Sequence, residues 1–523
     1  MALVVAACGS GTDTDETVID EPAVGNDTSS GTPETSAEGA DASGDAGEAG
    51  EEDVVSEAVV LSIVDTGQSQ CYDETGAVAC PQAGEELFGQ DGNYAGTQPS
   101  YTDNGDSTVT DNVTGLIWQQ DPGEKMTYAQ AASGADSFEL AGYDDWRLPS
   151  IKELYSLIDF AGTDPSGCPS SNCEATPFID TGFFDFQYGD PDEGERMIDS
   201  QWATSTIYVG TTMGGDETMF GVNFADGRIK GYGLSDPRGG EKTFFVSYVR
   251  GDPGYGENAY VDGGDGTVTD TASGLMWQQD DSTDSMDWSE ALAYCAAADT
   301  GGHDDWRLPD AKELQGIVDY TRSPSTTDSA AIDPILSASP ITDEGGGTDY
   351  GSYWTGTTHA SLMGGANAVY VAFGEALGWM ENPQTGEYTL LDVHGAGAQR
   401  SDPKTGDAAD YPYGHGPQGD VIRIENLVRC VRGGDLETVT GGEVVLDDET
   451  DSESSSPQTP AETEEGGPLA AAAAQLGVTE RELAAALGDP GSGPPDFEMA
   501  GAALGVSVDA LMEAVGAPPT NGP

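Results

Sequence analysis

Two sets of aspartates carry side chains that could bind a cation. The carboxylates stand at short, matching spacing with a glycine among them, and oxygen ligands on a tight turn are what Ca²⁺ prefers. The pattern therefore suggests calcium as a cofactor. The alternative is a plain turn that leads into a β-hairpin, since no glutamate stands where an EF-hand places its bidentate ligand. The aspartates are Asp103, Asp106 and Asp111 in the first set and Asp262, Asp265 and Asp270 in the second.

Cysteine is the other side chain with distinctive chemistry, and the chain has seven. If Cys8 carries a lipid, an even number remains, which in an exported protein indicates three disulfides. No Lys, Arg or His lies near Cys168 and Cys173 to lower a thiol pKa, so we expect a loop-closing disulfide there rather than a reactive pair. The six remaining cysteines are Cys71, Cys80, Cys168, Cys173, Cys295 and Cys430.

The segment before Cys8 indicates export. Val5-Ala6-Ala7-Cys8 resembles the lipobox of a bacterial lipoprotein signal, although residues 1–8 lack a basic segment and a full apolar stretch. The alternative is a chance apolar start with a free thiol. Residues 9–57 are acidic and poor in aromatics, so we expect a disordered tether after the anchor. No run approaches the ~20 apolar residues of a spanning helix, and a lipid at Cys8 would be the membrane anchor.

The balance of charge excludes whole classes of partner. The chain has 18 basic and 94 acidic residues, a formal net charge of −76. This excludes nucleic acid and argues against anionic lipid or sulfated polysaccharide as a ligand. The charge either serves solubility or makes an acidic surface for one cationic partner.

The histidines give no sign of a hydrolase. The chain has no HExxH motif, no paired metal-ligand spacing and no Ser-His-Asp signature. We therefore expect a protein without catalytic activity. The four histidines are His303, His359, His394 and His415.

The central region is duplicated. Residues 103–121 match residues 262–280, and Asp-Asp-Trp-Arg-Leu-Pro recurs at 144–149 and 304–309. Val-Arg-Gly closes each copy, and two ordered series of motifs indicate two tandem domains.

Each copy has the pattern of an α+β domain. A Gly-bearing turn between β-type residues predicts an initial hairpin, and apolar spacing predicts helices near 126–135 and 286–298. A second helix follows the Pro of each copy, at 151–160 and 311–320, and begins with a capping box. Residues 220–229 and 368–379 are typical of further hairpins.

The motif order resembles a known family. Gly-Leu-Met-Trp-Gln, Trp-Arg-Leu-Pro with a Lys-Glu-Leu helix, and a closing Val-Arg-Gly-Gly resemble DUF1566, the carboxy-terminal (Lcl C-terminal) domain of collagen-like bacterial adhesins. The resemblance spans residues 60–434 and implies two tandem C-type-lectin-like domains. Formylglycine-generating enzymes share this fold, but their reactive cysteine pair lies beside the closing Arg-Gly-Gly, unlike Cys168 and Cys173. None of the tripeptides of calcium-dependent sugar binding in C-type lectins occurs.

The repeat also suggests disulfide pairs. Cys295 aligns with Ala135 and Cys430 with Tyr248, so the first copy lacks both partners together. The bond would tie the first helix of the domain to its last strand, as the resemblance implies. We therefore expect three pairs: Cys295 with Cys430, Cys71 with Cys80, and Cys168 with Cys173.

The expected organisation has two α+β domains between acidic linkers. Residues 435–467 should be a second disordered linker, and 468–523 a small all-α module of helical hairpins. A helix-turn-helix DNA reader is the alternative for that module, but its single arginine, Arg481, argues against it. The first domain, with an N-terminal extension, spans 58–255 and the second spans 256–434.

We therefore expect a non-catalytic lipoprotein of the bacterial cell surface, for recognition or adhesion. Its partner would be an extracellular glycan or a surface protein. The alternatives are a structural component of a surface appendage or envelope coat, and a relative of formylglycine-generating enzymes that has lost its active site.

The ligand-binding residues are not specified, but two non-duplicated loops, 180–200 and 382–420, are the candidate surfaces. Four tryptophans of the shared motifs should be core residues rather than sugar platforms. Arg228, Lys230, Lys242 and Arg250 are the only loose basic cluster of the first domain, so a neutral glycan fits better than a sulfated one. The tryptophans are Trp146, Trp202, Trp306 and Trp354.

Overall fold

The computed structural model describes residues 61–168, 173–190, 194–235, 240–434 and 436–439, with Leu476, Leu483, Val506 and Leu511 as single positions. Several expectations lie outside these residues: the lipobox with Cys8, the linker 9–57, most of the linker 435–467, and all but single positions of the helical module 468–523. Glu437–Thr438, assigned from the sequence to the second linker, forms strand β24. No described helix is long and apolar enough to cross a membrane.

The described chain contains two tandem, mainly β repeats, which we call the first repeat (residues 101–250) and the second repeat (residues 260–432). Each repeat has a four-stranded antiparallel sheet in which its last strand joins its first three, in the orders β12-β6-β5-β4 and β23-β15-β14-β13. The first sheet contains β4 (Tyr101–Asp103), β5 (Thr108–Asp111), β6 (Ile117–Gln119) and β12 (Val249–Arg250). The second contains β13 (Tyr260–Asp262), β14 (Thr267–Asp270), β15 (Leu275–Gln278) and β23 (Val431–Arg432).

Each repeat then has two main helices, and all four begin with capping boxes. The expected boxes at Ser150 and Asp310 are confirmed, with Glu153 and Glu313 as their third helical residues. The same two glutamates also bind the arginine of the Trp-Arg-Leu-Pro motif, as in the pair of Arg307 with Glu313 at 2.5 Å. The two most obvious repeated motifs are therefore in direct contact. The helices are α1 (Tyr128–Gly134), α2 (Ile151–Tyr155), α3 (Trp288–Ala296) and α4 (Ala311–Gly316).

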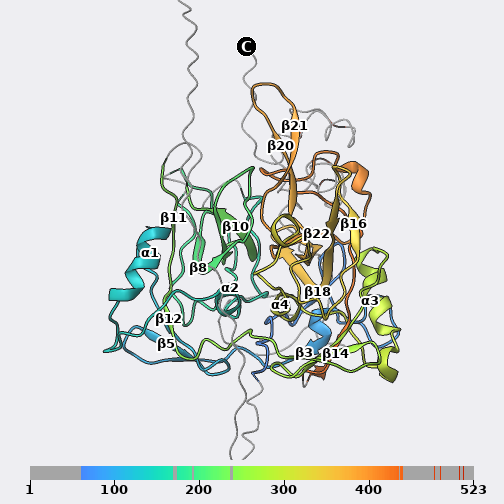
Figure 1. Cartoon of the computed structure of the whole chain (residues 1–523), viewed down its shortest axis with the longest axis horizontal. Helices are drawn as coiled ribbons and strands as arrows, with labels where there is room; N and C mark the ends of the chain where they lie inside the picture. The colour runs from blue at the N-terminus through green and yellow to red at the C-terminus, as the bar shows by residue number, and fades with distance from the viewer. Residues whose placement is uncertain are drawn as a thin grey trace, which may run out of the picture. The chain divides into compact units, whose positions relative to one another are not determined.

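A six-stranded antiparallel sheet runs through both repeats, in the order β18-β19-β22-β10-β9-β8 (Figure 1). The third strands of the two halves, β10 and β22, pair with each other at Ile229 and Gln399. We call this pairing the seam. Because equivalent strands meet antiparallel, the two repeats are related by a quasi-two-fold arrangement. The strands are β8 (Gln201–Ile207), β9 (Thr218–Asn223), β10 (Arg228–Gly233), β18 (Ser352–Ser361), β19 (Gly364–Ala372) and β22 (Gln399–Pro403).

One hydrophobic core lies beneath the seam. Ile229 of β10 and Val369 of β19 are fully buried in the same cluster, together with Leu154 of α2 and Leu314 of α4. Smaller clusters lie on the other face of the sheet, under α1 in the first repeat and under α3 in the second. Since burial of apolar surface is the main favourable term in folding, the repeats stabilise each other as parts of one unit.

Two equivalent lysines link α2 and α4 across the repeats. Nζ of Lys152 donates to the carbonyl of Gly316 at 2.7 Å, and Nζ of Lys312 donates to the carbonyl of Ser156 at 2.9 Å. Ser156 and Gly316 are themselves equivalent, so each ammonium group binds the end of the other repeat's helix, where free carbonyls favour a cation. We call this pair the lysine clasp. Burial lowers the pKa of both lysines to about 8, although nearby carboxylates act in the opposite direction.

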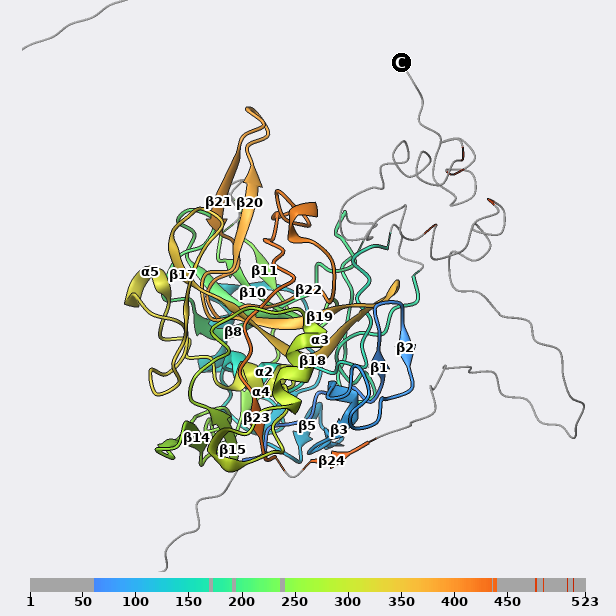
Figure 2. The ribbon, with the colours of Figure 1, turned by 90° about the vertical axis from the view of Figure 1, so that its right-hand side faces the viewer.

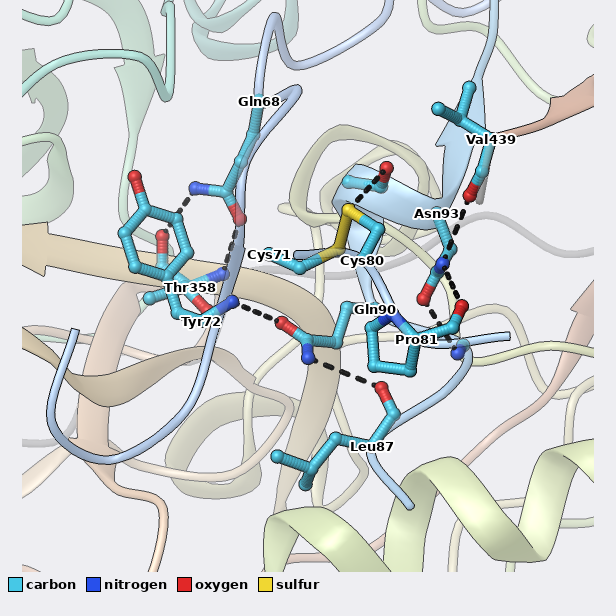
Figure 3. Close-up of a disulfide and its surroundings, with 12 residues drawn as sticks. Gln68, Cys71, Tyr72, Cys80, Pro81, Leu87, Gln90, Asn93, Thr358 and Val439 are labelled. Atoms are coloured by element: carbon cyan, nitrogen blue, oxygen red, sulfur yellow. Dashed lines mark hydrogen bonds between the residues drawn. A yellow bond between two sulfur atoms is a disulfide. The ribbon is translucent and has the colours of Figure 1, made fainter. Parts of the chain in front are cut away.

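An N-terminal extension, residues 61–100, packs against both repeats. The side chain of Gln68 donates to the carbonyls of Phe160 and Thr358, and accepts from the amide of Thr358. A disulfide between Cys71 and Cys80 closes the hairpin that follows (Figure 3). The extension contains β1 (Cys71–Tyr72), β2 (Ala77–Val78), η1 (Asp91–Asn93) and β3 (Tyr94–Ala95), which pairs with β24.

The remaining elements are short additions to this frame. In the first repeat they are β7 (Met126–Thr127), η2 (Ala135–Ser137) and β11 (Thr243–Phe244). In the second they are η4 (Thr300–Gly302), α5 (Pro324–Thr327), β16 (Pro340–Thr342), β17 (Thr348–Tyr350), β20 (Leu377–Glu381), β21 (Tyr388–Asp392) and η5 (Ala408–Asp410).

The two ends of the described body lie toward the same end of the molecule. The amide of Leu61 donates to the carbonyl of Ala272, beside β14, and the amide of Val439 donates to the carbonyl of Asn93, beside β3. Both β3 and β14 lie at the lower end of the molecule, whereas the hairpin β20–β21 projects from the upper end (Figures 1 and 2). The chain therefore enters and leaves the described body toward one end, and the projecting hairpin lies at the other.

Two expected disulfides, Cys71–Cys80 and Cys295–Cys430, are confirmed, and Cys168 is also joined to Cys173. Cys295–Cys430 ties α3 to the segment before β23. At the equivalent place in the first repeat, the hydroxyl of Tyr248 donates to the carbonyl of Ala131 in α1 at 2.8 Å. A hydrogen bond there replaces the covalent tie.

The lysine clasp makes a testable prediction. Lys312→Met leaves the buried carbonyls of Asp65 and Ser156 without this donor and should lower the free energy of unfolding by ~2 kcal/mol at pH 7. Because the folded-state pKa of about 8 lies below the unfolded value of 10.5, the unfolded chain binds more protons between these pH values. The wild-type advantage should therefore grow as pH rises through that window.

Urea unfolding of wild type and Lys312→Met at pH 7, 8, 9 and 10 measures this difference. Lys125→Met is the matched control, because Lys125 pairs with the partly exposed Glu195 and its loss should change stability by less than ~1 kcal/mol. A Lys312→Met effect as small as that of the control would contradict the role of the clasp.

The two helix–strand ties make a second prediction. Replacing Cys295 and Cys430 by Ala should destabilise the chain by about 2 kcal/mol more than replacing Cys71 and Cys80, because the disulfide closes a far longer loop. Tyr248→Phe should cost ~1 kcal/mol, by a mechanism that reductant does not alter. Denaturant unfolding with and without dithiothreitol measures both effects. Non-reducing peptide mapping that found Cys295 free or joined to Cys71 would refute the pairing.

Candidate functional site

The seam carries charged side chains on the face that is not covered by the main core. Side chains alternate along a strand, so Arg228 and Lys230 point away from the core residue Ile229 that lies between them. Arg400 stands beside them on β22. These residues line a cleft of about 1660 Å³, which we call the seam cleft.

Both repeats build the seam cleft. The first repeat contributes parts of residues 164–174, 195–201 and 212–244, and the second contributes parts of residues 361–367 and 393–422. The two non-duplicated loops noted in the sequence, 180–200 and 382–420, therefore meet around one site. Neither repeat alone could form it.

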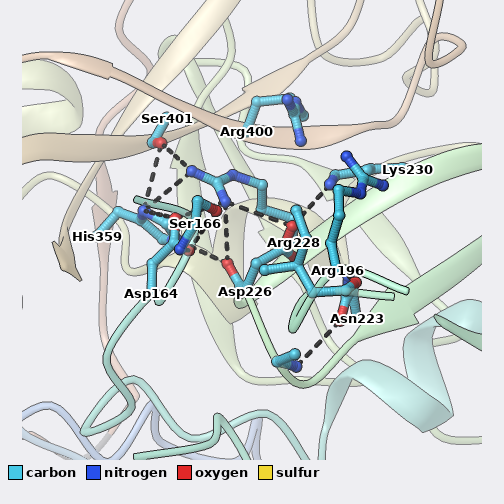
Figure 4. Close-up of polar contacts among 12 residues, drawn as sticks. Asp164, Ser166, Arg196, Asn223, Asp226, Arg228, Lys230, His359, Arg400 and Ser401 are labelled. Carbon is cyan, nitrogen blue, oxygen red and sulfur yellow. Dashed lines mark hydrogen bonds and ion pairs between the residues drawn. The ribbon is translucent and has the colours of Figure 1, made fainter. Parts of the chain in front are cut away.

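Arg228 is the centre of a buried ion-pair network (Figure 4). Its Nη1 lies 2.7 Å from Oδ2 of Asp164 and 3.4 Å from Oδ2 of Asp226, which also accepts from Nζ of Lys230 at 2.7 Å. Burial would raise the pKa of Asp164, but Arg228 and then His359 outweigh it and hold that pKa at about 2. Burial lowers the pKa of Lys230 to about 8 despite the attraction of Asp226. The network spans both repeats because His359 belongs to the second.

A second network holds the opposite wall. Arg400 forms an ion pair with Asp420, and Nε2 of His394 lies 3.0 Å from the other oxygen of that carboxylate. Burial lowers the pKa of His394 to about 4, as it does for His359, where Arg228 adds to the effect. Both imidazoles are therefore neutral at pH 7 and serve as hydrogen-bonding groups.

A third of the chain's lysines and arginines line the seam cleft, yet the cleft is not a basic patch. Six of the 18 lysines and arginines line it, and eight acidic residues lie among them. Close pairs such as Lys125–Glu195 at 2.7 Å and Arg196–Asp199 at 2.6 Å neutralise most of this charge. The basic residues are Lys125, Arg196, Arg228, Lys230, Lys242 and Arg400, and the acidic ones are Asp164, Glu174, Glu195, Asp199, Asp216, Asp226, Glu241 and Asp420.

Several buried polar atoms at the seam cleft keep spare hydrogen-bonding capacity. Within the described residues, Oδ1 of Asp226, Nε and Nη1 of Arg400, and the hydroxyl of Tyr232 have no hydrogen-bond partner. Buried polar groups in folded proteins are normally paired, and these atoms are covered by protein, so their spare capacity lies inside the cleft walls and not on the surface of the cleft. The balanced charge of the lining residues suits a polar ligand with little net charge.

The aspartates proposed for calcium each stabilise a turn. Oδ1 of Asp103 accepts from the amide of Gly105 at 2.8 Å, and Oδ1 of Asp111 accepts from Val113 at 2.9 Å. Asp106, Asp262, Asp265 and Asp270 also accept hydrogen bonds from residues of their own turns. Among the residues that the structure describes, no three His, Cys, Asp or Glu side chains are placed to hold a metal ion. Calcium binding stays a prediction, without a coordinating cluster to support it.

The structure buries Trp146, Trp202, Trp306 and Trp354 to 4% exposure or less, so all four are core residues.

The four residues of the loose basic cluster do not all lie at one site. Arg228, Lys230 and Lys242 line the seam cleft, whereas Arg250 pairs with Asp145 outside it. Arg196 and Arg400 also line the cleft. They lie in the two candidate loops, 180–200 and 382–420, but no repeated motif marks either residue.

The sequence pattern that defines the Lcl C-terminal domain matches residues 107–250 and again residues 266–391. The first match contains α1, α2 and all three strands of its half of the six-stranded sheet, and the second contains α3, α4, α5 and the first two strands of its half. The second match ends within β21, so β22 and the residues after it that line the seam cleft lie beyond the match. Comparisons with curated proteins and with solved structures gave no match. The two matches together cover more than half of the 523 residues, and the chain therefore belongs to the Lcl C-terminal domain family.

Proposed function

We propose that the chain is a non-catalytic recognition protein of the bacterial cell surface and that the seam cleft binds its ligand. The observation that carries this proposal is the convergence of the two non-duplicated loops on one cleft built from both repeats. Loops held by a rigid frame are where proteins commonly place binding residues.

A neutral glycan is the ligand class that fits best, with a surface protein as the alternative. Pockets for single small molecules have volumes of about 300–1,000 Å³, and the seam cleft is larger, which suits several sugar units or a peptide segment. Paired charges give no net attraction for a sulfated polymer. Partly exposed charged side chains of the lining, such as Glu241 and Lys242, can exchange hydrogen bonds with sugar hydroxyls.

Two further aspects of the proposal concern the fold and the absence of catalysis. We propose that each repeat is C-type-lectin-like, supported by the tie between the first helix and the last strand at Cys295–Cys430. Cys430 precedes the closing Val-Arg-Gly and is fully buried in that disulfide, whereas an oxidase of the formylglycine-generating type needs reactive thiols beside that motif. These features support a binding role over an enzymatic one.

The site and the ends of the body have an orientation that suits surface display. Leu61 and Val439 lie at one end, and the hairpin β20–β21 lies at the other. An anchor at Cys8 would then hold the end that is remote from the hairpin. Three disulfides are consistent with an oxidising compartment outside the cytosol.

The binding proposal is tested with the full chain on an array of neutral, amino and sulfated glycans, with and without calcium. We expect binding to neutral glycans that 0.5 M NaCl does not weaken. Arg196→Ala removes a partly exposed charged group from the cleft wall and should weaken binding about tenfold, while Arg250→Ala, an equally paired arginine outside the cleft, should leave it unchanged. Binding to sulfated glycans alone, abolished by salt, would contradict the proposal. Absence of any glycan or surface-protein ligand would favour the structural alternative.

The anchor is tested separately by metabolic labelling with a palmitate analogue in a bacterial host. The wild-type chain should incorporate the label and fractionate with membranes, whereas Cys8→Ser should do neither, because the thiol is the acceptor. Cys168→Ser together with Cys173→Ser is the control and should keep the label. Equal labelling of Cys8→Ser and wild type would refute lipidation at this position.

A further inference from the structure

The second repeat carries a hairpin that the first repeat lacks. Strands β9 and β10 are joined by residues 224–227, whereas residues 373–398 join the equivalent strands β19 and β22 and contain β20 and β21. The hairpin projects beyond the rest of the body in both views (Figures 1 and 2). It is therefore an addition that the shared fold does not require.

Three aromatic residues cluster on this projection. The rings of Tyr388 and Tyr413 are stacked, with centroids 3.9 Å apart and planes 15° apart, and Trp379 meets Tyr413 edge to face at 6.4 Å. Tyr388 is 37% exposed and Tyr413 is 52% exposed. We call these three residues the tyrosine platform. Single exposed aromatics are common, but several in contact at a projecting tip are typical of a binding surface.

The backbone holds the platform in place. The amide of Trp379 donates to the carbonyl of Gly419 at 2.7 Å, which fastens the 411–420 loop to β20. Gly419 has a φ of +60°, and a Cβ there would lie 2.2 Å from the carbonyl oxygen of Trp379. Only glycine allows this close approach, so the loop that carries Tyr413 is seated on the hairpin before any ligand arrives. A preformed surface loses less entropy on binding.

The charge around the platform selects among ligands. Neither residues 377–399 nor residues 405–420 contain a lysine or arginine, while Glu381 and Glu387 lie on the hairpin and Asp407 lies on the approaching loop. Sulfated and uronic-acid polymers would be repelled. Carboxylate oxygens at the edge of an aromatic face can accept hydrogen bonds from sugar hydroxyls.

We propose that the tyrosine platform is a stacking site for the pyranose rings of a neutral glycan. The C–H groups on the face of such a ring are apolar and match the flat face of a tyrosine, and the hydroxyls at the ring edge reach acceptors beside it. The proposal rests on the proposed function and names its ligand class. The 411–420 loop connects the two sites, because Tyr411 and His415 line the seam cleft while Tyr413 lies between them in the platform. One glycan chain then contacts the platform and the cleft together.

The test uses the full chain and three soluble probes: cellohexaose, chitohexaose and hexagalacturonate. Isothermal titration should give binding of at least one neutral hexasaccharide and none of the anionic one. Tyr413→Ala should weaken that binding about tenfold, and Tyr413→Phe should stay within about twofold of wild type because the ring face remains. Tyr143→Ala is the matched control, since Tyr143 is 42% exposed on the first repeat, outside the platform, and should change nothing.

The outcomes separate this inference from the proposed function. If Tyr413→Ala binds the neutral hexasaccharides as wild type does while Arg196→Ala is weakened, the platform is refuted and the seam cleft stands. If hexagalacturonate binds more tightly than both neutral probes, the ligand class is wrong. If no hexasaccharide binds, the platform is also refuted. Binding of other glycans or of surface proteins to the full chain then tests the seam cleft separately.

Discussion

A buried ammonium group needs acceptors on every side, and the lysine clasp has them only when both repeats are present. Lys152 reaches Gly316 of the second repeat, and Lys312 reaches Ser156 of the first. Without the second repeat Lys152 would lose the carbonyl of Gly316, and the carbonyl of Ser156 would lose Lys312 as its donor. Lost hydrogen bonds of a buried charge are costly in an apolar interior. The seam, the continuous core and the cleft above it all depend on this reciprocal contact.

The quasi-two-fold joint also explains why the candidate site is asymmetric. Equivalent strands meet at the seam, yet Arg228 organises one wall and Arg400 the other, with different partners. The core face needs matching shapes and has kept them, as Leu154 and Leu314 illustrate. On the opposite face the seam is lined by the cleft and not by a hydrophobic cluster, and there the two copies carry different loops.

Local features of the fold could be predicted from the sequence, and the association of the repeats could not. The capping boxes at Ser150 and Asp310 and the pairing of Cys295 with Cys430 follow from short-range patterns or from comparison of the copies. A lysine in a Lys-Glu-Leu helix looks like a surface residue in the sequence, because its acceptors lie more than 100 residues away. The two loops around the seam cleft were identifiable as non-duplicated, but their meeting depends on β10 pairing with β22, which no local pattern encodes.

The different ties at Tyr248 and Cys430 give the two halves different requirements for maturation. The hydroxyl of Tyr248 can donate its hydrogen bond to the carbonyl of Ala131 as soon as the surrounding chain is folded, and no other reactant is needed. The thiols of Cys295 and Cys430 must be oxidised by an external electron acceptor before their disulfide can form. The helix–strand tie of the first repeat thus forms without an oxidant, whereas the equivalent tie of the second repeat needs one.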